Sequence, residues 1–139
     1  MTTALNKALE VVGFEAGAIS LVDEDAQELA IRVHRGWRQQ DLADNMHVRL
    51  GQGLSGKAVA TGEVIVTGSL ENETRLAVPQ LREEGLHAMA LAPMRARGRV
   101  VGVLGVMSYE PRTFAPQSID VLKSIADQIG VAIDNAQLF

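Results

Sequence analysis

The sequence contains no cysteine among its 139 residues. This absence excludes disulfide bonds, thiolate metal sites, thioether-linked chromophores and cysteine nucleophiles. It also fits a reducing compartment, so we expect a cytoplasmic protein. Chemistry that depends on a reactive thiol is therefore outside the functions to consider.

Long apolar runs and basic clusters are also missing. The longest apolar stretch, Val100 to Met107, has the length of a strand and falls well short of the roughly 18 to 20 residues of a membrane span. The N-terminus has no basic region followed by an apolar signal core. The formal net charge is −4, and no Lys/Arg cluster could follow a phosphate backbone. We therefore expect neither membrane insertion nor a nucleic-acid partner.

Aromatic residues make up only 4% of the chain, whereas hydrophobic residues make up 47%. A core must therefore be built from Leu, Val, Ile, Ala and Met. The length fits one globular domain, residues 1–139. We expect this domain to have been excised from a larger, multidomain protein, because the final helix has no capping residue before the chain stops.

The beginning of the sequence predicts a helix followed by two strands. Apolar residues recur at helical spacing from Leu5 to Val12, and Gly13 then ends the helix. Ala18 to Val22 is short and apolar, and Leu29 to Val33 alternates between apolar and other residues. The turn between them predicts an antiparallel hairpin.

The middle of the sequence predicts short elements joined by glycines. The stretch Gly51 to Gly56 lacks the Gly-Lys-Ser/Thr ending of a phosphate-binding loop, so a glycine turn is favoured over a phosphate cradle. Ser55 is expected to cap the helix that follows. The remaining expected elements are a helical turn within 39–45, a strand at 48–50, a helix at 57–61 ended by Gly62, a strand at 64–66 and a helix at 77–84 ended by Gly85.

Two apolar runs, His87 to Met94 and Val100 to Ser108, are separated by a short basic turn that contains Gly98. Both runs are apolar on both faces, which predicts central strands covered on each side. Together with the flanking helices, the order of elements is typical of an α+β domain with a mainly antiparallel sheet.

The last helix, which begins at Pro116, carries the strongest functional pattern. Its apolar residues follow spacings of 3, 4, 3, 4 and 3, a heptad seam. A second apolar stripe includes Val121 and Ile125, so the helix has more apolar surface than one sheet needs. We expect a homodimer through this helix, with the N-terminal helix beside it, and we expect Ile129→Glu to separate the two copies without unfolding them. The seam consists of Ile119, Leu122, Ala126, Ile129, Ile133 and Ala136.

Several stretches together resemble the GAF domain family. They occur in the expected order and span almost the whole chain, although each alone is a loose pattern. The matching stretches are 17–23 (GAISLVD), 51–56 with 60–62 (GQGLSG and ATG), 92–94 with 102–106 (APM and GVLGV), and Phe114 with 126–129 and 132–136 (ADQI and AIDNA).

The resemblance implies a central antiparallel sheet of five or six strands, of the GAF/PAS-like type. The N- and C-terminal helices would pack on one face, and a pocket for a small molecule would lie on the other. The chain's ending is similar to that of domains joined to bacterial sensor histidine kinases of two-component systems, or to diguanylate cyclases. The expected pocket residues are Trp37, Val66, Leu76, Met89, Leu91 and Val106.

The sequence departs from the family pattern at several points. Ala115 stands where many relatives have a capping Ser or Thr, and Gly68-Ser69 where relatives often have Asp. The signature of the phosphodiesterase relatives is missing, so cyclic nucleotides have no direct support. Some relatives hold haem through a histidine; His87 is the nearest candidate, and an ordinary histidine at a strand end is favoured over a ligand. The cofactor is therefore left open.

We expect a ligand-sensing regulatory domain that relays its state through the last helix to an output domain, such as a histidine kinase, in the parent chain. The main alternative is a dimerisation or protein-interaction module without a ligand, which a pocket filled by the domain's own side chains would favour. An enzyme is the least favoured class. Free-standing GAF-like proteins that reduce free methionine sulfoxide use cysteine, which this chain lacks.

Overall fold

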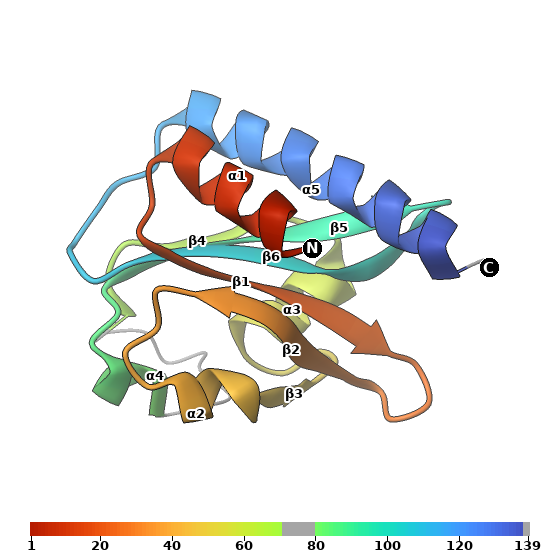
Figure 1. Ribbon diagram of the computed structural model, residues 1–139, viewed down its shortest axis with the longest axis horizontal. Coiled ribbons are helices and arrows are strands. Elements are labelled where there is room, and N and C mark those ends of the chain that lie inside the picture. The colour runs from red at the N-terminus through yellow and green to blue at the C-terminus, as the bar shows by residue number, and fades with distance from the viewer. Residues whose placement is uncertain (71–79, 138–139) are drawn as a thin grey trace.

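The computed structural model describes residues 1–70 and 80–137 (Figure 1). Among these residues, six strands form one sheet, and helices lie on both of its faces. In chain order the elements are α1 (Thr2–Val12), β1 (Ala16–Asp23), β2 (Glu28–Arg35), α2 (Gln40–Asp44), β3 (His47–Arg49), α3 (Gly53–Thr61), β4 (Ile65–Thr67), α4 (Gln80–Glu84), β5 (Ala88–Ala96), β6 (Arg99–Ser108) and α5 (Pro116–Gln137).

The sheet has the strand order β3-β2-β1-β6-β5-β4, and every neighbouring pair is antiparallel. The predicted α+β class with an antiparallel sheet of five or six strands is therefore confirmed, and the sheet has six. The long strands β1, β5 and β6 are central and almost entirely buried, as expected for runs that are apolar on both faces. The short strands β3 and β4 form the two edges.

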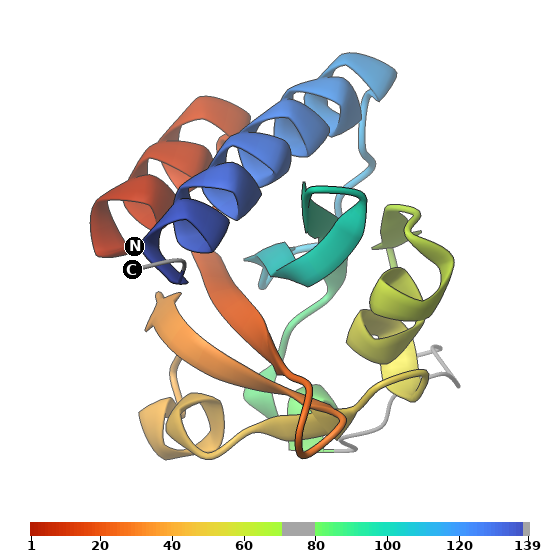
Figure 2. The ribbon, with the colours of Figure 1, turned by 90° about the vertical axis from the view of Figure 1, so that its right-hand side faces the viewer.

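Helices α1 and α5 lie side by side on one face of the sheet, and α2, α3 and α4 lie on the other (Figures 1 and 2). The chain enters and leaves at the same end of this helical layer (Figure 1). Gly13 ends α1 with a φ of 74°, a conformation that glycine adopts without strain. No helix of the described residues has the length and apolarity to cross a bilayer.

Alternating side chains of the central strands supply two separate apolar cores. In β6, Leu104 and Val106 face α1 and α5, whereas Val103 and Met107 face the opposite layer. The residues of strand β5 divide in the same way, and Ala90 faces α1 and α5. We call the core between the sheet and these two helices the helical-side core. Because successive side chains of a strand point to opposite faces, β5 and β6 each contribute to both cores.

The heptad seam of α5 serves the domain's own core. Leu122, Ala126, Ile129 and Ile133 are all buried against the sheet and α1, while Ala136 is exposed. The expectation that the four buried residues form a dimer seam is therefore corrected, whereas the expectation for Ala136 stays a prediction. The 3-4 spacing is shared by coiled coils and by any helix that packs one face on a sheet, so spacing alone did not separate them. Ile119, the remaining seam residue, is half-buried against the same core.

Ile129 is only 7% exposed, so a glutamate there would place a charge in the core. The expectation that Ile129→Glu leaves the fold intact is therefore also corrected. The exposed valines of this helix, Val121 and Val131, lie outside the seam. The homodimer itself stays a prediction.

The glycine-rich stretch is mostly helical. Helix α3 begins at Gly53, not at residue 57, and its N-cap is Gln52, so the expectation that Ser55 is the cap was wrong. Gly56 lies where the preceding loop folds back: a Cβ there would lie 2.7 Å from the Arg49 carbonyl oxygen. Packing of this tight turn overrides the low helix propensity of glycine. The expected helix at 77–84 is described only from Gln80, and residues 77–79 lie outside the described ranges.

Candidate functional site: an apolar cavity beneath the second helical layer

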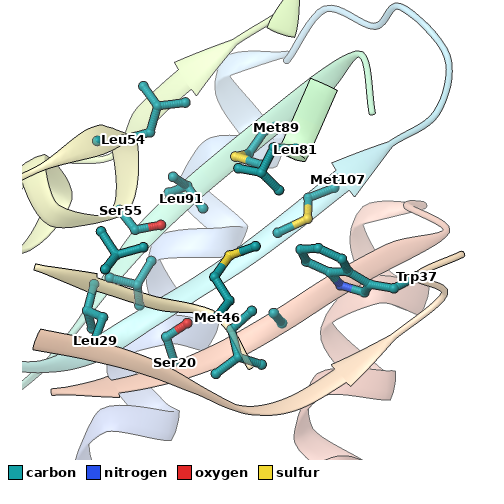
Figure 3. A pocket seen from close by; sticks show the side chains of 16 residues that line it. Ser20, Leu29, Trp37, Met46, Leu54, Ser55, Leu81, Met89, Leu91 and Met107 are labelled. Carbon is teal, nitrogen blue, oxygen red and sulfur yellow. The ribbon is translucent and has the colours of Figure 1, made fainter. Parts of the chain in front are cut away.

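A cavity of about 40 Å³ lies between the sheet and the layer that holds α3 and α4 (Figure 3). Strands β1, β2, β5 and β6 form its floor. Trp37 in the β2–α2 connection, the segment from the end of α2 through β3, and helices α3 and α4 supply the rest. Its lining consists of Ala18, Ser20, Leu29, Ile31, Trp37, Met46, Val48, Gly53, Leu54, Ser55, Leu81, Met89, Leu91, Val103, Gly105 and Met107.

Three of the residues predicted for a pocket line this cavity: Trp37, Met89 and Leu91. Val66 does not, because it lies on the edge strand β4 with 39% of its surface exposed. Val106 belongs to the helical-side core, since its neighbours Gly105 and Met107 take the cavity face of β6. The predictions for Val66 and Val106 are corrected accordingly. The sixth residue, Leu76, lies outside the described residues.

Sequence reasoning missed the residues that give the cavity its character. Ser20 and Ser55 are the hydroxyl-bearing residues of its described lining, and Met46 joins Met89 and Met107 in its wall. Ser20 could have been found, because it alternates with Ala18 on the face of β1 opposite Ile19. Ser55 could not, because it was assigned to a loop in place of the start of α3.

The described part of the cavity wall is apolar and uncharged. None of the lining residues within 1–70 and 80–137 carries an ionisable side chain. The lining residues that are partly exposed belong to β1, β2, β3, the segment before β3 and the start of α3, whereas Trp37, Met89 and Met107 are buried. In Figure 3, Ser20 and Ser55 lie toward one end and Trp37 and Met107 toward the other. The cavity therefore has a deep apolar end and a more open end with two hydroxyls.

Trp37 is fixed in the deep end by its polar edge. Its indole Nε1 donates a hydrogen bond to the Gly17 carbonyl oxygen at 3.0 Å, and the residue is 5% exposed. The preceding Gly36 has a φ of 79°, and a Cβ there would lie 2.2 Å from the Glu15 carbonyl oxygen. The turn can therefore approach β1 closely enough to insert the indole only because residue 36 is glycine.

A buried carboxylate holds the end of α4 beside the Trp37 turn. Glu84 is 2% exposed, and it accepts hydrogen bonds from the backbone N–H groups of Arg38 at 2.7 Å and Gln39 at 2.8 Å. The Tyr109 hydroxyl donates to the same carboxylate, and the Arg38 guanidinium lies 3.9 Å from the centre of the Tyr109 ring. We call Glu84, Arg38, Gln39 and Tyr109 the Glu84 cluster.

The Glu84 cluster shifts two pKa values in opposite directions. Burial raises the pKa of Glu84, but hydrogen bonds from Tyr109 and the two backbone N–H groups outweigh it, so the pKa is lowered from its ordinary value. Burial and the hydrogen bond to Glu84 raise the pKa of Tyr109 from 10.0 to about 12. The neutral phenol and the ionised carboxylate are thus the stable pair.

The C-terminal end of β6 and the residues after it also contact the segment that follows α1. Glu15, just after α1, accepts hydrogen bonds from the Ser108 hydroxyl at 2.7 Å and the Tyr109 backbone N–H at 2.8 Å. Arg112 donates to the Gly13 carbonyl oxygen at 2.6 Å and lies over the Phe14 ring. Residues 108–112 therefore touch the cavity-side cluster through one side chain and the end of α1 through others.

Two of the three histidines pair with carboxylates in the described part of the chain. His34 pairs with Asp44 at 2.5 Å and His47 with Glu28 at 2.9 Å. His87 lies just before β5 and is not among the cavity-lining residues. Within residues 1–70 and 80–137, no group of three or more His, Cys, Asp or Glu side chains could hold a metal ion.

Comparison with protein families gives one match, to the GAF domain, over residues 1–134. This chain belongs to the GAF domain family. The resemblance stated from the sequence is therefore confirmed, and the cavity lies on the face of the sheet where that resemblance implied a pocket. No curated protein matches the sequence.

Solved structures share the fold at low sequence identity. The GAF domain of a phosphoenolpyruvate-protein phosphotransferase from Coxiella burnetii has a TM-score of 0.87 at 19% identity, over 99% of this chain and 82% of that one. A domain of a putative two-component sensor histidine kinase from Sinorhizobium meliloti has a TM-score of 0.78 at 20% identity, covering 98% and 90%. Free methionine-R-sulfoxide reductase from Neisseria meningitidis has a TM-score of 0.76 at 20% identity, covering 93% and 72%.

Proposed function

We propose that this GAF domain is the sensory part of a signal-transduction protein, and that the occupancy of its cavity is relayed through α5 to an output domain. The observation that carries the proposal is the shared use of β5 and β6. Met89, Leu91 and Met107 line the cavity from these strands, and Ala90 and Val106 face α5 from the same strands. A displacement of either strand by a ligand would change the surface on which α5 rests.

Close backbone contact fixes α5 to the hairpin of β5 and β6. A Cβ on Gly130 would lie 2.6 Å from the Arg95 carbonyl oxygen, so the helix touches the strand at this point without an intervening side chain. Strand β5 has an irregularity in its pairing with β6 between Met94 and Arg95, at the same place. Such contact leaves little room for the strand to move without the helix.

Ion pairs extend this attachment toward the end of α5. Asp134 is 5% exposed, and its carboxylate lies 3.0 Å from Arg97 Nε and 3.6 Å from an Arg99 guanidinium nitrogen. Both arginines lie in or beside the turn of the hairpin. A buried carboxylate that lost these partners would be left uncompensated, so α5 and the hairpin are expected to move as one unit.

The kinds of protein that share the fold support a signalling role. They include a sensor histidine kinase domain, a GAF domain of a phosphotransferase and a GAF domain/HD domain protein from Geobacter sulfurreducens. We propose a regulatory domain in preference to an enzyme like the similar methionine sulfoxide reductases, because this chain has no cysteine for that chemistry. A histidine kinase is the output domain we favour, in a cytoplasmic parent protein.

A second candidate is a regulatory module that binds no small molecule. The small volume of the cavity, about 40 Å³, favours it, because the domain's own side chains already fill most of the space. Three of those side chains are methionines, however, which change rotamer readily and can make room for a ligand. A ligand-sensing domain therefore requires these methionines to move and admit a ligand, whereas the ligand-free module does not.

Native mass spectrometry of the protein purified from cells separates the two candidates. Gly105→Ala is the test variant, because its Cβ would press within 3.0 Å of the Leu91 and Met107 side-chain ends and narrow the cavity. Val66→Ala, on the edge strand outside the cavity, is the matched control. We expect wild type and Val66→Ala to retain a small molecule that Gly105→Ala loses. Bare protein in all three would favour the ligand-free module.

A further inference from the structure

We propose that the cavity takes a small, uncharged ligand with an apolar body and one hydrogen-bonding oxygen, such as a short alcohol or carbonyl compound. This inference rests on the proposed function and specifies the ligand class of the same cavity. The body would lie at the deep end, beside Trp37 and Met107. The oxygen would lie at the more open end, between Ser20 and Ser55 (Figure 3).

The two serine hydroxyls identify the polar end. Among the described residues, neither the Ser20 nor the Ser55 hydroxyl has a hydrogen-bond partner, and both residues are partly exposed. By contrast, the polar edge of Trp37, at the deep end, is already satisfied by the Gly17 carbonyl oxygen. A ligand oxygen therefore gains hydrogen bonds at one end of the cavity only, and this fixes its orientation.

The absence of charge in the described part of the wall argues against an ionised ligand. Within residues 1–70 and 80–137, no lining residue is ionisable, so a carboxylate or ammonium group inside the cavity would find no side-chain counterion among them. Withdrawing an unpaired ion from water reduces binding by about two orders of magnitude or more. The start of α3 at Gly53 and Ser55 favours an anion, but a helix N-terminus contributes less than about tenfold in affinity at a site of this kind.

Size limits the class further. A cavity of about 40 Å³ holds only a few non-hydrogen atoms before its wall must move. The side chains of Met46, Met89 and Met107 are the parts of that wall that adapt most readily. Large planar cofactors would have to displace Trp37 or α4, both of which are fixed by hydrogen bonds.

The test compares three probes of the same length: 1-butanol, butyrate and n-butylammonium. Trp37 is the only tryptophan in the chain, so its fluorescence reports on the cavity. Methyl resonances of Met46, Met89 and Met107 give the site, while Met94, in the helical-side core, and Met1, at the surface, serve as internal controls. We expect 1-butanol to shift the three cavity methyls and to bind at least tenfold more tightly than either ion.

Serine variants test the orientation of the ligand. We expect Ser55→Ala and Ser20→Ala each to weaken 1-butanol binding by about 2- to 10-fold, the range for one neutral hydrogen bond, and to leave binding of benzene unchanged. The matched control, Ser124→Ala, changes an exposed serine of α5 and is expected to have no effect on either probe.

The outcomes separate this inference from the proposed function. Tighter binding of butyrate or butylammonium than of butanol would overturn the uncharged class and leave a ligand-binding cavity in place. Butanol binding that both serine variants leave unchanged would overturn the polar end. No response of the cavity methyls to any of the four probes would overturn the inference and the proposed ligand-sensing function together.

Discussion

Replacing Glu84 by glutamine tests whether the Glu84 cluster holds α4 and the Trp37 turn together. Tyr109 is the only tyrosine in the chain, so the ultraviolet absorbance of ionised tyrosine reports on this one phenol. In the folded protein its pKa is raised from 10.0 to about 12 by burial and by the hydrogen bond to Glu84. We expect Glu84→Gln to move the pKa back toward 10 because it removes the negative charge.

The raised pKa also makes a contribution to stability whose sign is fixed. A phenol that is harder to ionise in the folded state stabilises the protein below its unfolded pKa of about 10, and this stabilisation is lost as the pH rises through about 12. Two pKa units correspond to about 2.7 kcal/mol. Because Tyr109 is only half-buried and solvent screens its side of the interaction, we expect Glu84→Gln to lower the unfolding free energy at neutral pH by roughly 1 to 2 kcal/mol.

A pH jump read before the protein unfolds gives the pKa, and urea unfolding gives the free energy. Glu83→Gln is the matched control, because Glu83 is the exposed neighbour of Glu84 on α4. The control is expected to titrate and unfold like the wild type. If folded wild-type Tyr109 ionised near pH 10, or if Glu84→Gln left its pKa near 12, the described role of this cluster would be refuted.

Three further predictions concern α5 and the acid side of the pH range. Ile129→Glu is expected to lower the free energy of unfolding in urea by about 3 kcal/mol or more, because it buries an unpaired charge. The control Val131→Glu, on the exposed face, is expected to change this free energy by less than about 0.5 kcal/mol. Equal effects of the two variants would contradict the assignment of the seam to the core. Ala115→Ser, at the N-cap of α5, is expected to raise the melting temperature through a stabilisation of about 0.5 to 2 kcal/mol, and no change would show that the cap is not formed. Because the pKa values of Glu84 and Glu15 are lowered in the folded protein, the stability that they contribute above pH 4.5 is lost as the pH falls through their folded-state pKa values. The unfolding free energy of Glu84→Gln is therefore expected to depend less on acid pH than that of the wild type. Parallel plots of unfolding free energy against pH for the two proteins would contradict this.

Most of the fold could be predicted because each layer leaves a periodic signal in the sequence. The alternation of Leu29 to Val33 and the apolar runs on either side of Gly98 gave the strands, and Gly13 and Gly62 gave helix ends through their left-handed conformation. Where a side chain pointed was harder to predict. A strand that is apolar on both faces, such as β6, gives no sign of which residues face which layer, and Val106 was assigned to the wrong one.

The candidate site was predicted only in part, since its key features depend on tertiary contacts. The seam of α5 had the spacing of a coiled coil, and only the position of the sheet shows that Leu122 and Ile129 face inward. Ser55 was misplaced because helix α3 continues through glycines that propensity would put in a loop. The Glu84 cluster could not be predicted, because it joins residues from positions 38, 84 and 109 that share no local pattern.

The most direct test of the central claim is methyl and amide NMR under xenon pressure. Xenon occupies dry apolar cavities whatever the polarity of the natural ligand, so the test does not depend on the ligand class. The Met89 and Met107 methyls report occupancy of the cavity, and the backbone amides around Gly130 report the state of α5. We predict that both sets of signals shift together with the same dependence on xenon pressure. Cavity methyls that shift while the α5 amides stay unchanged would contradict the proposed relay.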